Sequence, residues 1–184
     1  MTTSETLPGY KAGTWTIDQT HTEVGFSVRH LMISKVRGSF TTIAGKITTA
    51  ENPLDSTAEL TVELASIDTR NEDRDTHLRS SDFFDAETNP TMTYQTTSLH
   101  REGDEIVVEG NLTIKDVTRP VTLNVEYNGV GGDPWGGTRL GLSAKGQINR
   151  NDFGISFNMP LDGGGVMVGE RVQLIIEVEA VLDV

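Results

Sequence analysis

The stretch Val172-Gln-Leu-Ile-Ile-Glu-Val-Glu-Ala180 decides the fold, because every second residue along it is apolar. Glu177 and Glu179 fall between the apolar positions. Successive side chains of a β-strand point to opposite faces, so this pattern predicts a strand with one buried face and one solvated face.

The same alternation recurs along most of the chain. The other segments that we expect to be strands are Thr22–His30, Val36–Thr49, Thr57–Ala65, Thr91–Leu99, Glu105–Lys115, Val121–Tyr127 and Leu140–Ile148. We expect the second of these to be kinked at Gly38 and Gly45, and we expect turns at 128–138 and 162–169. At least eight strands in a chain of 184 residues indicate one all-β domain, here assigned to residues 13–184.

Only one segment has the character of a helix, and it lies near residues 71–80. Asn71 suits the N-cap position, and acidic residues follow it in the first turn, where the helix dipole favours them. A helix of about two turns is unstable alone. We therefore expect Leu78, Phe83 and Phe84 to hold it against the rest of the protein.

Strands with one apolar face need a second apolar surface, which either a sandwich or a closed barrel provides. Closure also removes the exposed edge strands, so we favour an extended eight-stranded antiparallel barrel. A barrel of eight strands is either filled by side chains or holds one small ligand. Small residues on the inward faces favour a ligand cavity, although they can also mark bends; they are Ala58, Gly110, Ala144 and Gly146.

Composition excludes several classes of protein and site. The sequence has no cysteine, so disulfides, thiolate metal sites and cysteine nucleophiles are absent. The formal net charge of −12 disfavours binding to nucleic acid and charge-driven docking to anionic lipid. No segment approaches the roughly 20 apolar residues of a membrane span. The polar residues 1–12 have no secretory signal pattern, so we expect a flexible arm on a cytoplasmic protein.

The sequence has four histidines, which are candidates for catalysis or for binding a metal or ligand, and none of them has the spacing of a metal-binding motif. His30 ends an inward-facing row, where it either contacts a ligand head group or bonds to the backbone at the rim. Arg74 and His77 share a helix face and either meet a ligand at the barrel mouth or serve structure. Asp82 and Asp85 are expected to be cap or turn residues.

Three further residues have structural and functional readings. Arg150, in Asn149-Arg-Asn-Asp-Phe-Gly154, is expected to lock a turn by a salt bridge to an Asp, with head-group binding as the alternative. Trp15 is expected to cover one end of the barrel. Trp135 lies in a Gly/Pro-rich hairpin tip and should be exposed, which makes it a candidate for a homodimer contact.

Six motifs in a fixed order resemble the YceI-like family of polyisoprenoid-binding, lipocalin-like barrels. They are Trp15-Thr-Ile-Asp18 with His21-Thr-Glu-Val-Gly-Phe26 and Val28-Arg-His-Leu31, then Val36-Arg-Gly-Ser-Phe40, then Asp68-Thr-Arg-Asn-Glu-Asp-Arg74 leading to Ser81-Asp-Phe-Phe-Asp85, then Asn89-Pro90, then Gly110-Asn-Leu-Thr-Ile114 with Val117-Thr-Arg-Pro-Val121, and Asn149-Arg-Asn-Asp-Phe-Gly154. Together they cover nearly all of residues 15–180.

The resemblance implies an eight-stranded barrel that encloses an isoprenoid-type lipid, such as an isoprenoid quinone or a polyprenyl phosphate, in an apolar tunnel. It implies no catalytic residue and no cofactor beyond that ligand. Together with the inward pattern, it predicts a set of ligand-binding residues: Phe26, Val28, His30, Phe40, Leu60, Val62, Arg74, His77, Phe83, Phe84, Leu112, Val125, Leu142, Ala144 and Ile176.

Two other functions remain open at this point. One is an enzyme that uses Arg74, His77 and Asp82 at the barrel mouth on a small or isoprenoid substrate. The other is a structural or stress-related dimeric module with an incidental cavity. A barrel filled by its own side chains would favour that module over a carrier.

Overall fold

The computed structural model of this protein describes residues 7–162 and 164–184. Within that part of the chain there are eleven strands and one α-helix, α1 (Glu72–Arg79). The strands are β1 (Gly13–Ile17), β2 (Glu23–His30), β3 (Ser34–Phe40), β4 (Ile43–Thr49), β5 (Thr57–Glu63), β6 (Ile67–Asp68), β7 (Thr91–Glu102), β8 (Glu105–Ile114), β9 (Val117–Gly132), β10 (Thr138–Asn149) and β11 (Val168–Leu182).

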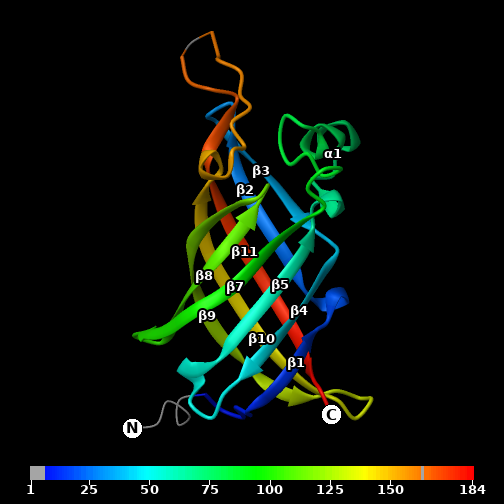
Figure 1. Ribbon diagram of the computed structural model, residues 1–184, viewed down its shortest axis with the longest axis vertical. Coiled ribbons are helices and arrows are strands. Elements are labelled where there is room, and N and C mark those ends of the chain that lie inside the picture. The colour runs from blue at the N-terminus through cyan, green and yellow to red at the C-terminus, as the bar shows by residue number, and fades with distance from the viewer. Residues whose placement is uncertain (1–6, 163) are drawn as a thin grey trace.

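The strands form one antiparallel sheet that closes on itself where β1 pairs with β11. Three neighbouring walls of the barrel are each made of two short strands, β1 with β2, β3 with β4, and β5 with β6. With each such pair taken as one wall, the barrel has eight walls connected in chain order. The predicted eight-stranded closed barrel is therefore confirmed (Figure 1).

Each of the three walls made of two strands is interrupted between those strands, and the interruptions lie at one level of the barrel. Polar side chains form hydrogen bonds with the backbone there. Ser66 Oγ accepts hydrogen bonds from the backbone N–H groups of Thr41 and Thr42 at 3.1 Å. Gln19 Oε1 accepts one from Ile43 N at 3.3 Å. The prediction that Val36–Thr49 kinks at Gly38 and Gly45 is wrong, because the break falls at Thr41–Thr42.

The glycine at position 38 serves close packing instead of a kink. Gly38 lies directly opposite Phe26 on the neighbouring strand. A Cβ atom at position 38 would lie 2.5 Å from the Phe26 ring, a separation that side-chain atoms do not adopt. The glycine therefore leaves room for the aromatic ring on the inward face.

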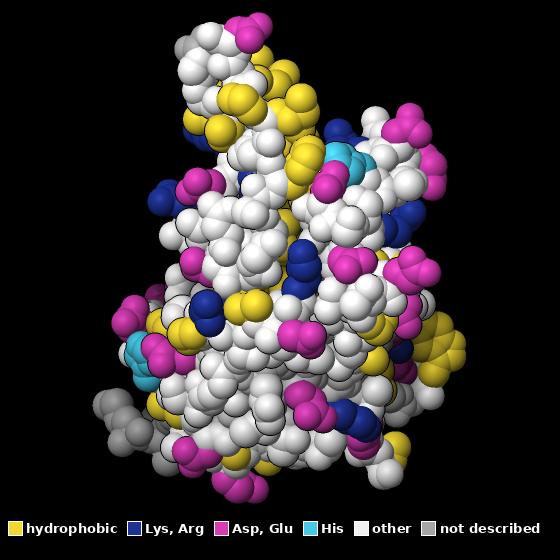
Figure 2. Space-filling model, turned by 45° about the horizontal axis from the view of Figure 1, so that its top comes forward, with side chains coloured by type: hydrophobic (Ala, Val, Ile, Leu, Met, Phe, Trp, Pro, Cys, Tyr) yellow, Lys and Arg dark blue, Asp and Glu magenta, His cyan; other side chains and the backbone are white. Residues whose placement is uncertain are grey.

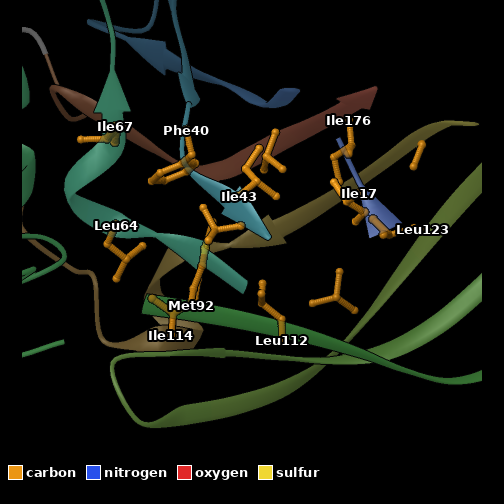
Figure 3. Packing of buried hydrophobic residues seen from close by; sticks show 14 of the residues in the cluster. Ile17, Phe40, Ile43, Leu64, Ile67, Met92, Leu112, Ile114, Leu123 and Ile176 are labelled. Carbon is orange, nitrogen blue, oxygen red and sulfur yellow. The ribbon is translucent and has the colours of Figure 1, made fainter. Parts of the chain in front are cut away.

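The inward faces of the strands supply the buried residues. Figure 3 shows Phe40, Ile43 and Met92, each from a different strand, converging on the interior with Leu64 from the turn after β5. Phe40 also packs edge-on against Phe84, with the ring centres 5.8 Å apart. This contact joins the barrel wall to the segment that follows α1.

Helix α1 forms where the sequence predicted it, and it lies beside one end of the barrel (Figure 1). Asn71 Oδ1 accepts a hydrogen bond from Arg74 N and caps the helix. The buried carboxylate of Asp75 accepts hydrogen bonds from the backbone N–H and the hydroxyl of Thr69, so the helix is tied to the chain before it. None of the helices in the described ranges is both long and apolar enough to cross a membrane.

The opposite end of the barrel, called the base here, holds residues 7–12 and the C-terminus (Figure 1). Residues 1–6 of the expected flexible arm lie outside the described residues, but residues 7–12 are packed and not loose. Leu7 is buried, Tyr10 donates a hydrogen bond to Ala50 O at 2.6 Å, and Tyr127 donates one to Pro8 O at 2.8 Å. The aromatic and aliphatic side chains of this short segment explain the packing, since they find apolar surface at the barrel end.

Candidate functional site

The interior of the barrel holds a cavity of about 300 Å³. Its wall extends from Leu7 and Tyr10 at the base to Phe83 and Phe84 beside α1 at the other end, called the apex here. A volume of this size spread over the length of the barrel describes a narrow, elongated space. It far exceeds the roughly 10–15 Å³ that a single water needs.

Every strand except β1 places inward side chains on this wall, and β3 contributes Phe40. The wall includes Val24, Phe26, Val28, Phe40, Ile47, Leu60, Val62, Met92, Leu99, Leu112, Val121, Val125, Leu142, Ala144, Leu174, Ile176 and Val178. The barrel is thus not filled by its own side chains, which argues against the purely structural module.

Near the base of the cavity, Thr49 on the wall is bonded to residues behind it. Trp15 is completely buried, and its indole N–H donates a hydrogen bond to Thr49 Oγ1 at 2.8 Å. The Thr49 hydroxyl in turn donates to Lys11 O at 2.7 Å. Trp15 is therefore a buried core residue, as predicted, but it does not itself line the cavity, so its covering of one end of the barrel stays a prediction.

Polar groups that reach the wall already have partners in the protein. The Tyr94 hydroxyl donates to Val121 O at 2.9 Å, and burial raises the pKa of Tyr94 to about 12. Thr96 Oγ1 accepts a hydrogen bond from Ala58 N at 2.9 Å. Among the described residues no buried side-chain nitrogen or oxygen lacks a partner. A molecule in the cavity would therefore meet carbon along nearly its whole length.

Arg150 is the one charged side chain on the described part of the wall, and it lies at the apex. It is buried, and it donates to the carbonyl oxygens of Gly169 and Ile155 at 2.8 Å and of Phe157 at 2.9 Å. Desolvation lowers the pKa of this guanidinium. The predicted salt bridge to an Asp is wrong, because backbone carbonyls of the 155–169 segment take its place.

Twelve of the fifteen predicted ligand-binding residues line the cavity. They are Phe26, Val28, Phe40, Leu60, Val62, Phe83, Phe84, Leu112, Val125, Leu142, Ala144 and Ile176. The period-two pattern was sufficient to find the ten strand residues among them, because it fixes which side chains of a strand point inward.

The other three predicted residues, His30, Arg74 and His77, do not line the cavity. His30 stands at the end of β2, beyond the last inward residue of that strand that reaches the wall. Arg74 folds back to donate to Thr69 Oγ1 and Thr69 O at 2.8 and 2.7 Å.

His77 belongs to an aromatic cluster with Phe83, which lines the cavity, and Phe157, which does not. Its ring packs edge-on against Phe83 and Phe157, with centres 5.1 and 5.0 Å apart, and Nε2 lies 2.9 Å from Asp82 Oδ2. The cluster connects the α1 segment to the 155–167 loop across the apex. Arg74 is directed to Thr69 and does not join His77 and Asp82, so the three residues of the enzyme hypothesis do not converge on one site.

Two of the four small inward residues leave no space for a ligand. A Cβ atom on Gly110 would lie 2.5 Å from the Tyr94 ring, and one on Gly146 would lie 2.7 Å from a Leu123 methyl group. Larger neighbours thus fill the space above both glycines. Ala58 and Ala144 do line the cavity, so the prediction that small inward residues make room for a ligand applies to two of the four residues.

Sequence reasoning missed a polar network on the outside of the base. Asp18 Oδ2 lies 2.7 Å from Arg139 and 2.8 Å from His21, and Arg139 also contacts Asp133 at 2.9 Å. The Arg139 guanidinium, followed by the His21 ring, holds the pKa of Asp18 well below its usual range. These residues come from two distant parts of the chain, 18–21 and 133–139, so no local pattern identifies the network.

Comparison with known proteins gives a consistent result. Residues 15–180 match the model of the YceI-like domain. A UPF0312 protein of Staphylococcus epidermidis is 43% identical over 168 residues, which are 90% of this chain and 96% of that protein. The crystal structure of the Campylobacter jejuni YCEI protein is 31% identical, with a TM-score of 0.70, over 91% of this chain and 96% of that one.

A more distant structure shares the fold alone. It is described as a polyisoprenoid binding domain from Saccharophagus degradans implicated in plant cell wall breakdown. Its sequence is 16% identical, the TM-score is 0.67, and the match covers 94% of this chain and all of that one.

Proposed function

This chain belongs to the YceI-like family, and from that premise and its cavity we propose that it binds and carries an isoprenoid-type lipid inside the barrel. The observation that carries the proposal is the elongated, carbon-lined cavity. The fold shared with a domain described as polyisoprenoid binding supports the same ligand class. An isoprenoid quinone and a polyprenyl phosphate are the two candidates.

The energetics suit such a ligand. Transfer of an alkyl chain from water to an apolar interior contributes about 0.8 kcal/mol per CH₂ group, so a few isoprene units outweigh the cost of ordering the chain. The polar groups at the wall are occupied by protein partners, so they favour no compact polar molecule. A linear hydrocarbon fits both the shape and the chemistry of the cavity.

The head group of the ligand would lie at the apex. Arg150 is there, and three of its N–H groups are committed to the carbonyls of Gly169, Ile155 and Phe157. The guanidinium also keeps its charge at the end of an otherwise apolar wall. The base offers no comparable cation on the cavity wall within the described residues.

The substitution Val125→Asp tests the proposal. Val125 lines the cavity and lies opposite Ala144 on the next strand, so a carboxylate there would be buried beside the hydrocarbon chain. We expect uptake of a detergent-dispersed isoprenoid quinone, measured by its absorbance after gel filtration, to fall at least about tenfold.

Asn124→Asp is the matched control, because Asn124 is exposed on the outer face one residue away. It adds the same charge, and uptake should stay within about twofold of the wild type. Circular dichroism of both variants reports whether the barrel is intact. Lack of quinone uptake by the wild-type protein, together with no lipid in organic extracts of it, would overturn the proposal.

A further inference from the structure

The apex carries exposed apolar side chains at the tip of the β2–β3 hairpin. Leu31, Met32 and Ile33 are 39%, 47% and 83% exposed. Leu31 and Met32 also have positive φ angles of 54° and 64°, which bulky residues rarely adopt. Glycine and asparagine are the usual residues at such positions, so this turn presents large apolar groups where small polar ones would fit the backbone better.

The neighbouring 155–167 loop extends this surface. Leu31 N donates to Met167 O at 2.8 Å, and Met167 N donates to Met159 O at 2.9 Å, so hairpin and loop form one unit. Met159 is 53% exposed. We call Leu31, Met32, Ile33 and Met159 the apical tip. Figure 2 shows hydrophobic side chains on the protruding loop and in the hollow between that loop and the α1 segment.

Three positively charged side chains lie just below the tip, on the outer face of the β2–β3 hairpin. Arg29, Lys35 and Arg37 alternate with the inward Val28 and Val36, so all three are on the outer face of the hairpin, and all are exposed. No Asp or Glu occurs between residues 24 and 50, although the whole chain has a net charge of −12. We call these three residues the basic collar.

Among residues 7–162 and 164–184, no ion pair joins the collar to an acidic side chain. Arg29 and Lys35 are direct cross-strand neighbours, an arrangement that repels. The ion pairs among the described residues all involve other side chains. The acids on β2, on the strands that pair with the hairpin and in the neighbouring loop are Glu23, Asp68, Asp162, Glu170, Glu177 and Glu179, and none of them forms an ion pair with the collar. The charge of the collar is therefore available to an external anion.

From these observations we infer that the apical tip and basic collar dock the protein onto a bilayer that contains anionic phospholipid. The tip would enter the interface between head groups and acyl chains, and the collar would contact the phosphates. The tip adjoins the apical end of the cavity, where Arg150 and Val168 line the wall. A docked barrel would thus present that end to the membrane.

The size and shape of the surface favour a bilayer over a protein partner. A stable protein interface uses about 20–30 residues on each side, whereas the tip offers four exposed apolar residues on a narrow projection. A few inserted side chains with adjacent cations suit weak, reversible binding to a membrane surface. The overall acidity of the chain keeps the remaining surface away from the same lipids.

The inference of docking depends only on the apical tip and the basic collar. The idea that a docked barrel exchanges its ligand with the membrane rests on the proposed lipid-carrying function. Two readouts separate these statements. Vesicle binding needs no ligand in the cavity, and quinone uptake from detergent needs no vesicle. Loss of uptake with intact vesicle binding would contradict only the proposed function.

The test is co-sedimentation of the full chain with vesicles of equal parts phosphatidylcholine and phosphatidylglycerol. We expect binding at low salt, weaker binding at high salt, and little binding to phosphatidylcholine alone. The double substitution Lys35→Gln and Arg37→Gln should weaken binding about thirtyfold, because each cation near an anionic surface contributes about 1 kcal/mol. Ile33→Ser should weaken it about tenfold.

Matched controls come from elsewhere on the molecule. Arg101→Gln with Lys145→Gln removes the same charge away from the tip, and Trp135→Ser removes an 80%-exposed apolar residue at the base. Both controls should bind within about twofold of the wild type. All variants should retain quinone uptake from detergent.

A fluorescent reporter gives an independent measurement. In the variant Trp135→Phe with Ile33→Trp, the only exposed tryptophan is at the tip, and its emission should shift to the blue on addition of the anionic vesicles. In the wild type, Trp135 should not shift. The inference is overturned if the wild type does not bind anionic vesicles, if the tip and collar variants bind as well as the controls, or if Trp135 is the residue that shifts.

Discussion

The base and the apex of this barrel are built from opposite kinds of contact. At the base, Trp15 is completely buried and Leu7 and Tyr10 pack beneath the strands. At the apex, Ile33 and Met159 are exposed, and one buried cation organises the loop. The base therefore resembles an ordinary protein core, whereas the apex keeps apolar surface in water. The difference predicts that removal of a buried side chain at the base costs more stability than removal of an exposed side chain of the apical tip.

Removal of the Trp15 side chain should give the largest effect on stability. Trp15→Ala deletes a fully buried ring and its hydrogen bond to Thr49, so we expect the free energy of unfolding to fall by about 3–5 kcal/mol. Urea denaturation followed by circular dichroism measures it. Trp135→Ala removes the same side chain from the surface and should cost less than about 0.5 kcal/mol. Equal losses in the two variants would remove the contrast between the base and the surface.

Arg150→Met tests the organisation of the apex. The substitution keeps an unbranched apolar stem but leaves the carbonyls of Gly169, Ile155 and Phe157 without their donor, and we expect a loss of about 2–3 kcal/mol. Hydrogen exchange should speed up in residues 155–169 and stay unchanged in β1 and β4. Arg171→Met, at an exposed position nearby, is the control. Faster exchange throughout the base would show that the two ends are not independent.

The smallest of these effects concerns Asp18 on the outside of the base. The pKa of Asp18 is lowered in the folded protein, mainly by Arg139 and then by His21. The ionised carboxylate therefore stabilises the fold at neutral pH. This stability is lost as the pH falls below about 4, where the carboxyl begins to be protonated in the unfolded chain. Asp18→Asn should cost about 1 kcal/mol at pH 7 and reduce the loss of stability between pH 4 and pH 2.

Thermal unfolding of both proteins over that pH range measures the effect. Glu126→Gln, at an exposed position of the outer wall, is the control and should leave the acid profile unchanged. An Asp18→Asn profile that coincides with the wild type would show that the network adds nothing to the base.

Local sequence pattern was sufficient for much of the fold. Alternation predicted the strands and the inward residues such as Val125 and Ile176, because the direction of a side chain in a strand depends only on its position in that strand. The helix over 71–80 was equally local, since Asn71 and the acids after it belong to one turn. The family motifs then identified the barrel among the folds that alternation allows.

The sequence alone could not show which residues meet across the barrel. That Tyr94 fills the space above Gly110, and that Leu123 fills the space above Gly146, depends on the register between different strands. The carbonyl partners of Arg150 and the network around Asp18 and Arg139 likewise join distant parts of the chain. The direction in which a side chain points depends on its own strand alone. A contact between two side chains depends on two strands, and the closed sheet decides which strands are neighbours.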